Sequence, residues 1–435
     1  MSEEGHRGEL IYTDRSSKES KETWDVENDR IPADEVPDGG LMAWLQVVGA
    51  FFFLFNTSGI INSFGIFQTY YEGSILEDKS ASSISWIGSI QAFLVLFVGA
   101  LTGPLFDMGY FRVMTVIGTV FITFAMMMVS ISTKYWHFIL AQSLCFGFAG
   151  ACLFVPGIAI VSTYFSKNRV LAIGIATSGS SIGAVVYTVL FRKIVNKPEI
   201  GFGWTARILG FFMLGTLLIS NVTLRPRVPA SHRRSLFVVG AVKEPASLIF
   251  LFGILLGYMG AYIPYYHATA YAMRKAGASE PLGYYLVAII NGASAFGRII
   301  PSILADRIGP FNTLAPMAIA SAILAFCWLG IKNVPGMCVF TILYGFFTGA
   351  YVSLPPSCVA SLTNNLHEMG ARVGICFLFA GVGMLVGNPI AGALVDLDTD
   401  SFWKAQVCCG ALVTGSAACL TLSKFILNRH LMAKV

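Results

Sequence analysis

Charge is scarce in this 435-residue chain. Asp, Glu, Lys and Arg together make up 12% of the residues, whereas soluble domains contain roughly 25%. Hydrophobic residues make up 55% of the chain, and the mean hydropathy is +0.69. This composition excludes an ordinary soluble domain and predicts an integral membrane protein.

Chemical motifs are missing as well. The sequence contains no phosphate-binding loop of the G-x-x-x-x-G-K-S/T type, no nucleophile–base arrangement and no Cys/His metal spacing. Its nine cysteines fall in apolar stretches, where we interpret them as small membrane-helix residues. We therefore expect no ATP-driven work, no enzyme activity, no cofactor, no metal and no nucleic-acid partner.

Acidic residues are rare after the first forty positions, because half of the 24 lie before Leu41. Residues 1–40 are polar and lack both the apolar core of a signal peptide and the Arg-rich pattern of a transit peptide. We expect them to form a disordered acidic cytoplasmic tail.

Apolar stretches of about 20 residues, the length that crosses a bilayer as a helix, follow from Leu41 onward. They predict an all-α membrane protein with twelve transmembrane helices. The approximate spans are 42–67, 84–105, 111–132, 136–163, 169–191, 204–224, 246–272, 283–305, 313–331, 337–360, 373–395 and 405–427.

The longest polar break between spans covers residues 225–245 and is basic. It separates a six-helix half at 41–224 from a second half at 246–427, and residues 428–435 form a short tail. Basic loops lie in the cytoplasm, so we expect this linker and both termini there. Arg192, Lys193 and Lys197 would then lie outside.

An internal repeat relates the two halves. Asp107 and Asp306 follow the second and eighth spans and are 199 positions apart (306 − 107). Pro156 and Pro355, in the fourth and tenth spans, have the same separation (355 − 156 = 199). Carriers built from parallel repeats bind substrate between the halves near the membrane midplane. The repeat therefore predicts alternating-access transport of a small organic solute.

Small residues crowd the fifth span, directly after a basic turn at residues 167–169. Gly174, Ser178, Gly179 and Gly183 recur at close helical spacing, which lets neighbouring helix backbones approach closely in a bilayer. We expect this span to pack between helices rather than face lipid.

Several motifs resemble those of a known family. The turns with Asp107 and Asp306 resemble the major facilitator superfamily motif G-x-x-x-D-R-x-G-R-R, with Met108 and Ser302 as departures. Residues 164–174 are similar to the Y-F-x-K-R-R-x-L-A-x-G signature of the monocarboxylate porter family within that superfamily, with Asn168 in place of the first Arg. That family's D-G-G-x-G/A-W motif before the first span is matched, with one inserted residue, by Asp38, Gly39, Gly40 and Trp44.

The resemblance covers residues 37 to about 430, and the chain is most similar to the fungal members of the family. It implies the major facilitator fold of two six-helix pseudo-repeats. Charges at the cytoplasmic helix ends can form charge-assisted bonds that hold one gate state, although ordinary helix-end charge is the alternative. We expect the cytoplasmic gate to contain Asp107, Arg112, Lys167, Arg169, Asp306 and Arg307.

Arg298 is the one basic residue clearly inside a predicted span, and it resembles the buried arginine of the family. Its planar fork suits a carboxylate, and the alternative is a structural arginine that snorkels to the membrane edge. We expect the substrate site to contain Arg298, Asn62, Asn291, Ser294, Tyr266, His267 and Tyr351.

Titratable groups are few inside the spans. The resemblance implies a proton-coupling lysine in the first span and an aspartate in the eighth, but Asn62 and Ser294 occupy these positions. His267 could relay protons or be an interfacial residue. The neighbouring tyrosines could form an aromatic belt or line the cavity. Protons are thus a second candidate partner, beside the organic substrate and the lipid bilayer.

The favoured function is secondary active or facilitated transport of a monocarboxylate or carboxylate-bearing metabolite. Efflux of a lipophilic secondary metabolite is the alternative, motivated by the missing titrating pair and the uncharged aromatic spans. A nutrient sensor on a carrier fold is disfavoured by the short tails. We expect the plasma membrane, with the vacuolar or another internal membrane as the alternative. The sequence gives no sign of the oligomeric state.

Overall fold

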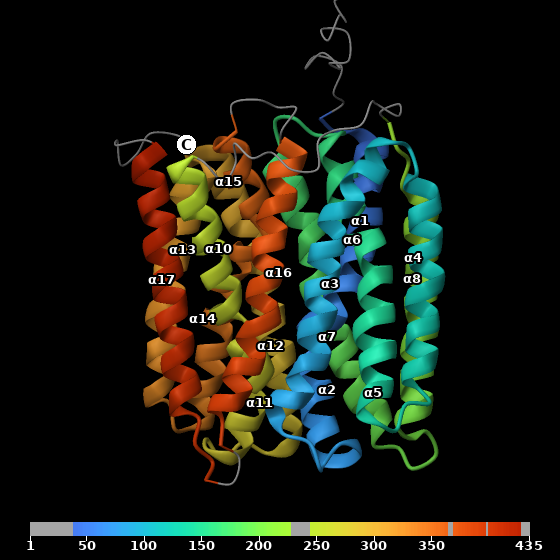
Figure 1. Ribbon diagram of the computed structural model, residues 1–435, viewed down its shortest axis with the longest axis vertical. Coiled ribbons are helices and arrows are strands. Elements are labelled where there is room, and N and C mark those ends of the chain that lie inside the picture. The colour runs from blue at the N-terminus through green and yellow to red at the C-terminus, as the bar shows by residue number, and fades with distance from the viewer. Residues whose placement is uncertain (1–37, 228–243, 364–368, 397–398, 428–435) are drawn as a thin grey trace, which may run out of the picture. The chain divides into compact units, whose positions relative to one another are not determined.

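The computed structural model describes residues 38–227, 244–363, 369–396 and 399–427, without the side chains of Pro104, Asp107 and Met369. Most of the expected N-terminal tail (1–40), most of the linker (225–245) and the tail at 428–435 lie outside the described residues. Apart from an isolated bridge between Asp396 and Ser401, every regular element in the described ranges is helical (Figure 1).

The elements of the first half, in chain order, include two short π-helices, η3 and η4. They are α1 Gly40–Asn62, α2 Phe64–Tyr70, η3 Tyr71–Ile75, α3 Ala81–Asp107, α4 Phe111–Val129, α5 Tyr135–Phe138, η4 Ile139–Cys145, α6 Phe146–Ser162, α7 Arg169–Val195 and α8 Gly201–Thr223.

The elements of the second half include one short 3₁₀-helix, η5. They are α10 Pro245–Ala261, α11 Ile263–Arg274, α12 Glu280–Ile308, α13 Pro310–Cys327, η5 Trp328–Gly330, α14 Val334–Ser353, α15 Pro355–Ser361, α16 Met369–Leu394 and α17 Trp403–Leu427.

Twelve helical stretches in the described ranges are long and apolar enough to cross a membrane, which confirms the predicted all-α class. Apart from the groups in their terminal turns, helices satisfy their backbone hydrogen bonds within themselves, as a lipid environment demands. The outer face of α4 carries large exposed apolar side chains, among them Val113, Val116, Val120, Phe121 and Phe124. Such a face would be costly in water and suits contact with lipid.

The helix bounds repeat with the offset found in the sequence. α3 begins at Ala81 and α12 at Glu280 (280 − 81 = 199), and α4 and α13 begin at Phe111 and Pro310 (310 − 111 = 199). The first and seventh membrane spans each contain a break, and these two breaks are also 199 positions apart. The elements therefore form two six-helix pseudo-repeats.

Each of those two spans is interrupted by one residue. α1 and α2 are separated by Ser63, and α10 and α11 are separated by Tyr262 (262 − 63 = 199). The second break follows from Pro264, which has no N–H to donate to the carbonyl oxygen four residues earlier. The carriers that bind substrate near the midplane commonly use interrupted helices of this kind.

Two long helix pairs join the pseudo-repeats, α3 with α16 and α7 with α12. Glycines allow close approach along the first pair: a Cβ on Gly381 would lie 3.3 Å from Leu96, and one on Gly392 would lie 3.0 Å from Ser82. We call the end of the bundle that holds Asp38 and the start of α7 the Asp38 side. The opposite end, where α12 begins, is the Glu280 side; α2 and α11 lie toward it (Figure 1).

Candidate functional site

Arg298 lies on α12 and is 2% exposed. Its Nη1 donates to the backbone carbonyl of Thr177 at 2.9 Å and also to the Ser180 hydroxyl, both on α7 of the other pseudo-repeat. Nε donates to the Ser294 hydroxyl at 3.5 Å. Nη2 donates to none of the described residues, and no carboxylate among them pairs with Arg298. The guanidinium therefore bridges the pseudo-repeats through neutral oxygens alone.

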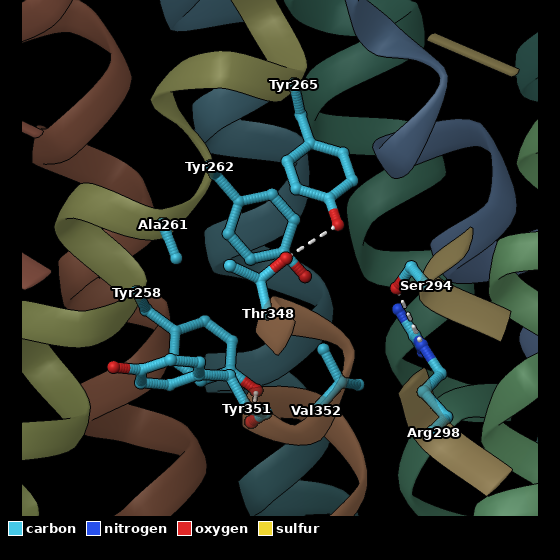
Figure 2. A pocket seen from close by; sticks show the side chains of 9 residues that line it. All are labelled: Tyr258, Ala261, Tyr262, Tyr265, Ser294, Arg298, Thr348, Tyr351 and Val352. Atoms are coloured by element: carbon cyan, nitrogen blue, oxygen red, sulfur yellow. Dashed lines mark hydrogen bonds between the residues drawn. The ribbon is translucent and has the colours of Figure 1, made fainter. Parts of the chain in front are cut away.

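Arg298 and Ser294 line one wall of a cavity. The rest of the lining comes from α10, α11, α14 and the break between α10 and α11: Tyr258, Ala261, Tyr262, Tyr265, Thr348, Tyr351 and Val352. Figure 2 shows the tyrosine rings grouped on one side of the view and Arg298 with Ser294 on the other. The cavity thus combines one cation, several aromatic rings and uncharged hydroxyls.

Asn62 and Asn291 meet at the break in the first span. Asn291 Nδ2 donates to the carbonyl of Asn62 at 3.2 Å and to that of Val287 at 2.9 Å. The Asn291 Oδ1 atom is buried and has no partner among the described groups. This contact crosses between the pseudo-repeats, but neither asparagine lines the cavity that contains Arg298.

The other predicted site residues divide between the cavity and its surroundings. Ser294 and Tyr351 line the cavity, and the Tyr351 hydroxyl makes a long contact of 3.4 Å with Ser416 Oγ. Tyr266 and His267 lie beyond the cavity lining, buried on α11; within the described part of the chain the Tyr266 hydroxyl and His267 Nε2 have no hydrogen-bond partner.

The pseudo-repeats touch on the Glu280 side through α2 and α11. The Phe64 and Tyr266 rings pack with centroids 5.2 Å apart, and Gly65 lies against the carbonyl oxygen of Tyr265. Nearby, Arg192 at the end of α7 pairs with Glu280 at the start of α12 at 3.0 Å. These contacts close the Glu280 side in this structure.

On the Asp38 side, two motifs singled out from the sequence bind each other. Asp38 Oδ1 accepts hydrogen bonds from the backbone N–H groups of Ser166 at 2.5 Å and Lys167 at 2.8 Å. Trp44 packs edge-on against Phe165, with centroids 5.3 Å apart. The segment before α1 is thereby fastened to the turn before α7.

The start of α7 also bonds to a carboxylate from the second pseudo-repeat. Asp306 Oδ2, near the end of α12, accepts a hydrogen bond of 3.1 Å from the Leu171 backbone N–H in the first turn of α7. A carboxylate at a helix N-terminus is favoured by the unpaired N–H groups and by the helix dipole. Asp306 is therefore placed to fasten the pseudo-repeats together on the Asp38 side.

The remaining predicted gate residues lie on this side with different contacts. Arg112 is exposed and donates to the Asn221 carbonyl, and Arg307 is exposed without a hydrogen bond to the described residues. Arg169 begins α7. Lys167 contributes its backbone N–H to Asp38. The side chain of Asp107 lies outside the described residues.

Residues 43–336 match the sequence model of the Major Facilitator Superfamily. The chain belongs to the major facilitator superfamily. Proteins of this superfamily are transporters, so the chain is a membrane transporter and not an enzyme.

Its relatives within the superfamily include fungal proteins of similar length. The MFS-type transporter dbaD of Emericella nidulans is 40% identical over 388 residues, which cover 88% of this chain and 87% of that protein. The agnestins efflux protein AgnL12 of Paecilomyces divaricatus is 37% identical and covers 81% of each chain. The aspyridones efflux protein apdF of Emericella nidulans is 34% identical, covering 91% of this chain and 80% of that protein.

A solved structure of the superfamily has the same fold. The crystal structure of the human organic anion transporter MFSD10 (TETRAN) matches with a TM-score of 0.64, and the match covers 89% of this chain and 99% of that chain. The sequence identity is 16%, so this likeness concerns the fold alone.

One ion pair of this major facilitator protein is not predicted by the sequence analysis. Glu244, the residue before α10, accepts two hydrogen bonds of 2.7 Å from Arg372 on α16, which also donates to the Leu362 carbonyl. These hydrogen bonds hold the pKa of the Glu244 carboxyl below its ordinary value. Arg372 lies one residue outside the predicted span 373–395, so the search for charges inside the spans does not reach it.

Proposed function

We propose that this transporter exports a lipophilic metabolite that bears a carboxylate, by alternating access between its two pseudo-repeats. The observation that carries the proposal is Arg298: it lines the cavity, its described partners are neutral, and its Nη2 nitrogen donates to none of them. An uncompensated arginine inside a membrane is costly, and a bound carboxylate would offset that cost through charge-assisted hydrogen bonds.

The rest of the cavity favours a lipophilic acid over a small hydrophilic one. Tyrosine rings, Ala261 and Val352 form most of the lining, and no other charged residue belongs to it. Binding sites of this kind use apolar surface for affinity and a few polar groups for orientation.

The names of two relatives support outward transport. Proteins 37% and 34% identical to this chain are described as efflux proteins for agnestins and aspyridones. Within the superfamily we assign the chain to the monocarboxylate porter family, which is supported by the contact of Asp38 with Ser166 and Lys167, since each partner belongs to a motif resembling that family.

Orientation, membrane and coupling are part of the same proposal. We place the Asp38 side in the cytoplasm of a protein in the plasma membrane and expect both termini there, because the linker sequence at 225–245 is basic and Arg225, at its described start, bonds to Gln46 of α1 and to Tyr164. Neither Asn62 nor Ser294 can titrate, so we expect efflux that does not require a proton bound at either position. His267 remains the candidate for any proton dependence.

The test is efflux from proteoliposomes that contain the purified full-length chain. Vesicles loaded with labelled lactate, pyruvate or a larger lipophilic monocarboxylate are compared with and without a proton gradient. We expect flux of the larger acid and little effect of the gradient. Arg298→Gln should lower affinity for it about 10- to 150-fold, because hydrogen bonds to charged groups contribute about 1.5–3 kcal/mol.

Arg207→Gln is the matched control, since it removes the same charge from an arginine that packs on Trp204 outside the cavity. It should transport like the unaltered protein. Equal flux in the Arg298→Gln variant would contradict the proposal, as would an absence of acid flux from correctly inserted protein. A melting temperature for each variant separates loss of binding from loss of folding.

A further inference from the structure

Three tyrosines of the interrupted seventh span lie on one face. Tyr258 and Tyr262 are four residues apart, and Tyr262 and Tyr265 are three apart, which are the spacings that bring helix side chains together. The ring centroids of Tyr258 and Tyr262 are 5.9 Å apart, and those of Tyr262 and Tyr265 are 5.3 Å apart. Together with Tyr351 from α14, they form the aromatic wall of the cavity (Figure 2).

The tyrosine hydroxyls of this wall differ in whether they form hydrogen bonds. The Tyr258 hydroxyl donates to the Tyr351 carbonyl at 3.0 Å, and the Tyr265 hydroxyl lies 3.1 Å from the Thr348 hydroxyl. The hydroxyl of Tyr262 bonds to none of the described residues, although this residue is only 8% exposed. The Tyr262 hydroxyl is not among the buried polar atoms that lack a partner, and Tyr262 lines the cavity, so this hydroxyl is accessible to a molecule bound there.

The geometry also relates the wall to the cation. Arg298, Tyr258, Tyr262 and Tyr265 all line one cavity. The accessible volume of the cavity is about 10 Å³ in this structure, so a flat ring can lie against the wall only after the pseudo-repeats move apart; a carboxylate substituent of that ring would then face Nη2 of Arg298. Aromatic rings gain from stacked or edge-on contact with one another beyond the area that they bury.

We infer that Tyr258, Tyr262, Tyr265 and Tyr351 form a ring-binding subsite opposite Arg298, and that the transported acid is an aromatic carboxylic acid. The free hydroxyl of Tyr262 would bond a polar substituent or a carbonyl of the same molecule. This inference rests on the proposed function, because it assumes that Arg298 receives the carboxylate, and it adds the chemical class of the remainder of the substrate.

The test compares two acids with the same carbon skeleton. Binding of naphthalene-2-carboxylate and of its saturated counterpart, decahydronaphthalene-2-carboxylate, is measured by calorimetry on the purified full-length protein in detergent. We expect the aromatic acid to bind about 2- to 10-fold more tightly. Tyr262→Leu should reduce this ratio to about one, whereas Tyr262→Phe should keep it because the ring remains.

Tyr110→Leu serves as the control, since Tyr110 is exposed and lies outside the cavity; the ratio should not change. Equal binding of both acids to the unaltered protein would overturn the inference while leaving the proposed function intact, and this measurement needs no variant to fold. An unchanged ratio in Tyr262→Leu would also overturn it. Failure of both acids to bind would instead count against the proposed function.

Discussion

A substitution at the contact between α2 and α11 should shift the balance between the arrangements that are closed and open on the Glu280 side. Gly65 lies against the backbone of the second pseudo-repeat, and a Cβ added there would overlap the carbonyl oxygen of Tyr265 and approach Tyr266 Cα at 3.5 Å. The overlapping atom belongs to the backbone, so it cannot rotate away as the end of a side chain could. Gly65→Ala should therefore push α2 and α11 apart.

The size of the effect follows from the cost of overpacking. Inserting a methyl group into a close-packed contact costs about 1–3 kcal/mol. The cost applies only to the arrangement in which the Glu280 side is closed, because the two helices must separate when that side opens. The balance should therefore shift about 5- to 150-fold toward the arrangement open on the Glu280 side. Transport should slow, since each cycle must pass through the closed arrangement.

The assay measures the separation directly. Spin labels on non-natural residues at Glu77 and Lys275, which are exposed near the ends of η3 and α11, leave the nine native cysteines unmodified. We expect the distance distribution of Gly65→Ala to gain a longer component. Gly73→Ala is the matched control, because a Cβ on Gly73 would meet nothing within 4 Å. Identical distributions and transport rates for Gly65→Ala and the unaltered protein would refute the reasoning.

Three further predictions concern single residues. Asp38→Gly should lower the melting temperature of the protein in detergent, since it removes the acceptor of two backbone hydrogen bonds. Each of these hydrogen bonds contributes about 1.5–3 kcal/mol at most. Asp38→Asn keeps an acceptor oxygen and tolerates the φ of 48°, so its melting temperature should fall less. Glu244→Gln should cost at most about 1 kcal/mol at neutral pH, because the Glu244 side chain is 44% exposed and solvent weakens the pair. The Arg372 hydrogen bonds depress its pKa, so this contribution is present above the unfolded pKa of about 4.3 and is lost as pH falls through the folded value; a melting-temperature difference that persists in acid would contradict this. Gly257→Ala would place a Cβ 2.6 Å from the Tyr351 ring, so it should push that ring into the cavity and favour smaller acids in competition binding.

The architecture was predictable from the sequence because it depends on local and repeated signals. Long apolar runs mark the twelve spans, and the offset of 199 between Asp107 and Asp306 recurs in the starts of helices and in the breaks at Ser63 and Tyr262. The break at Tyr262 could have been found from Pro264, which removes a donor from the helix.

The composition of the site was less predictable, because it depends on which helices meet. No periodicity shows that Arg298 faces Ser180, since the pairing of α7 with α12 joins distant parts of the chain. The sequence left two alternatives open for the tyrosines near His267. The structure puts Tyr262 and Tyr265 in the cavity with Tyr258, whereas Tyr266 packs against Phe64 outside it.

Arg298 bonds to α7, and these bonds compete with its proposed bonds to the substrate carboxylate. Its Nη1 already bonds to Thr177 and Ser180 on α7, while Nη2 is available. A carboxylate held by Nη2 alone would leave the pseudo-repeats tied at this point. A carboxylate held by both nitrogens, which is the favoured geometry for arginine, must draw Nη1 away from α7. Substrate binding would then loosen α7 from α12 at the middle of their contact.

Ser180→Ala distinguishes these two modes of binding. If the carboxylate displaces Nη1, removing the serine hydroxyl removes one bond that must break, and the affinity for a lipophilic acid should rise by up to about tenfold. Ser178→Ala is the control on the same helix, because the Ser178 hydroxyl donates to the Ile175 carbonyl and not to Arg298. Unchanged affinity in Ser180→Ala would mean that Nη2 alone receives the carboxylate, and the link between binding and separation of the halves would have to lie elsewhere.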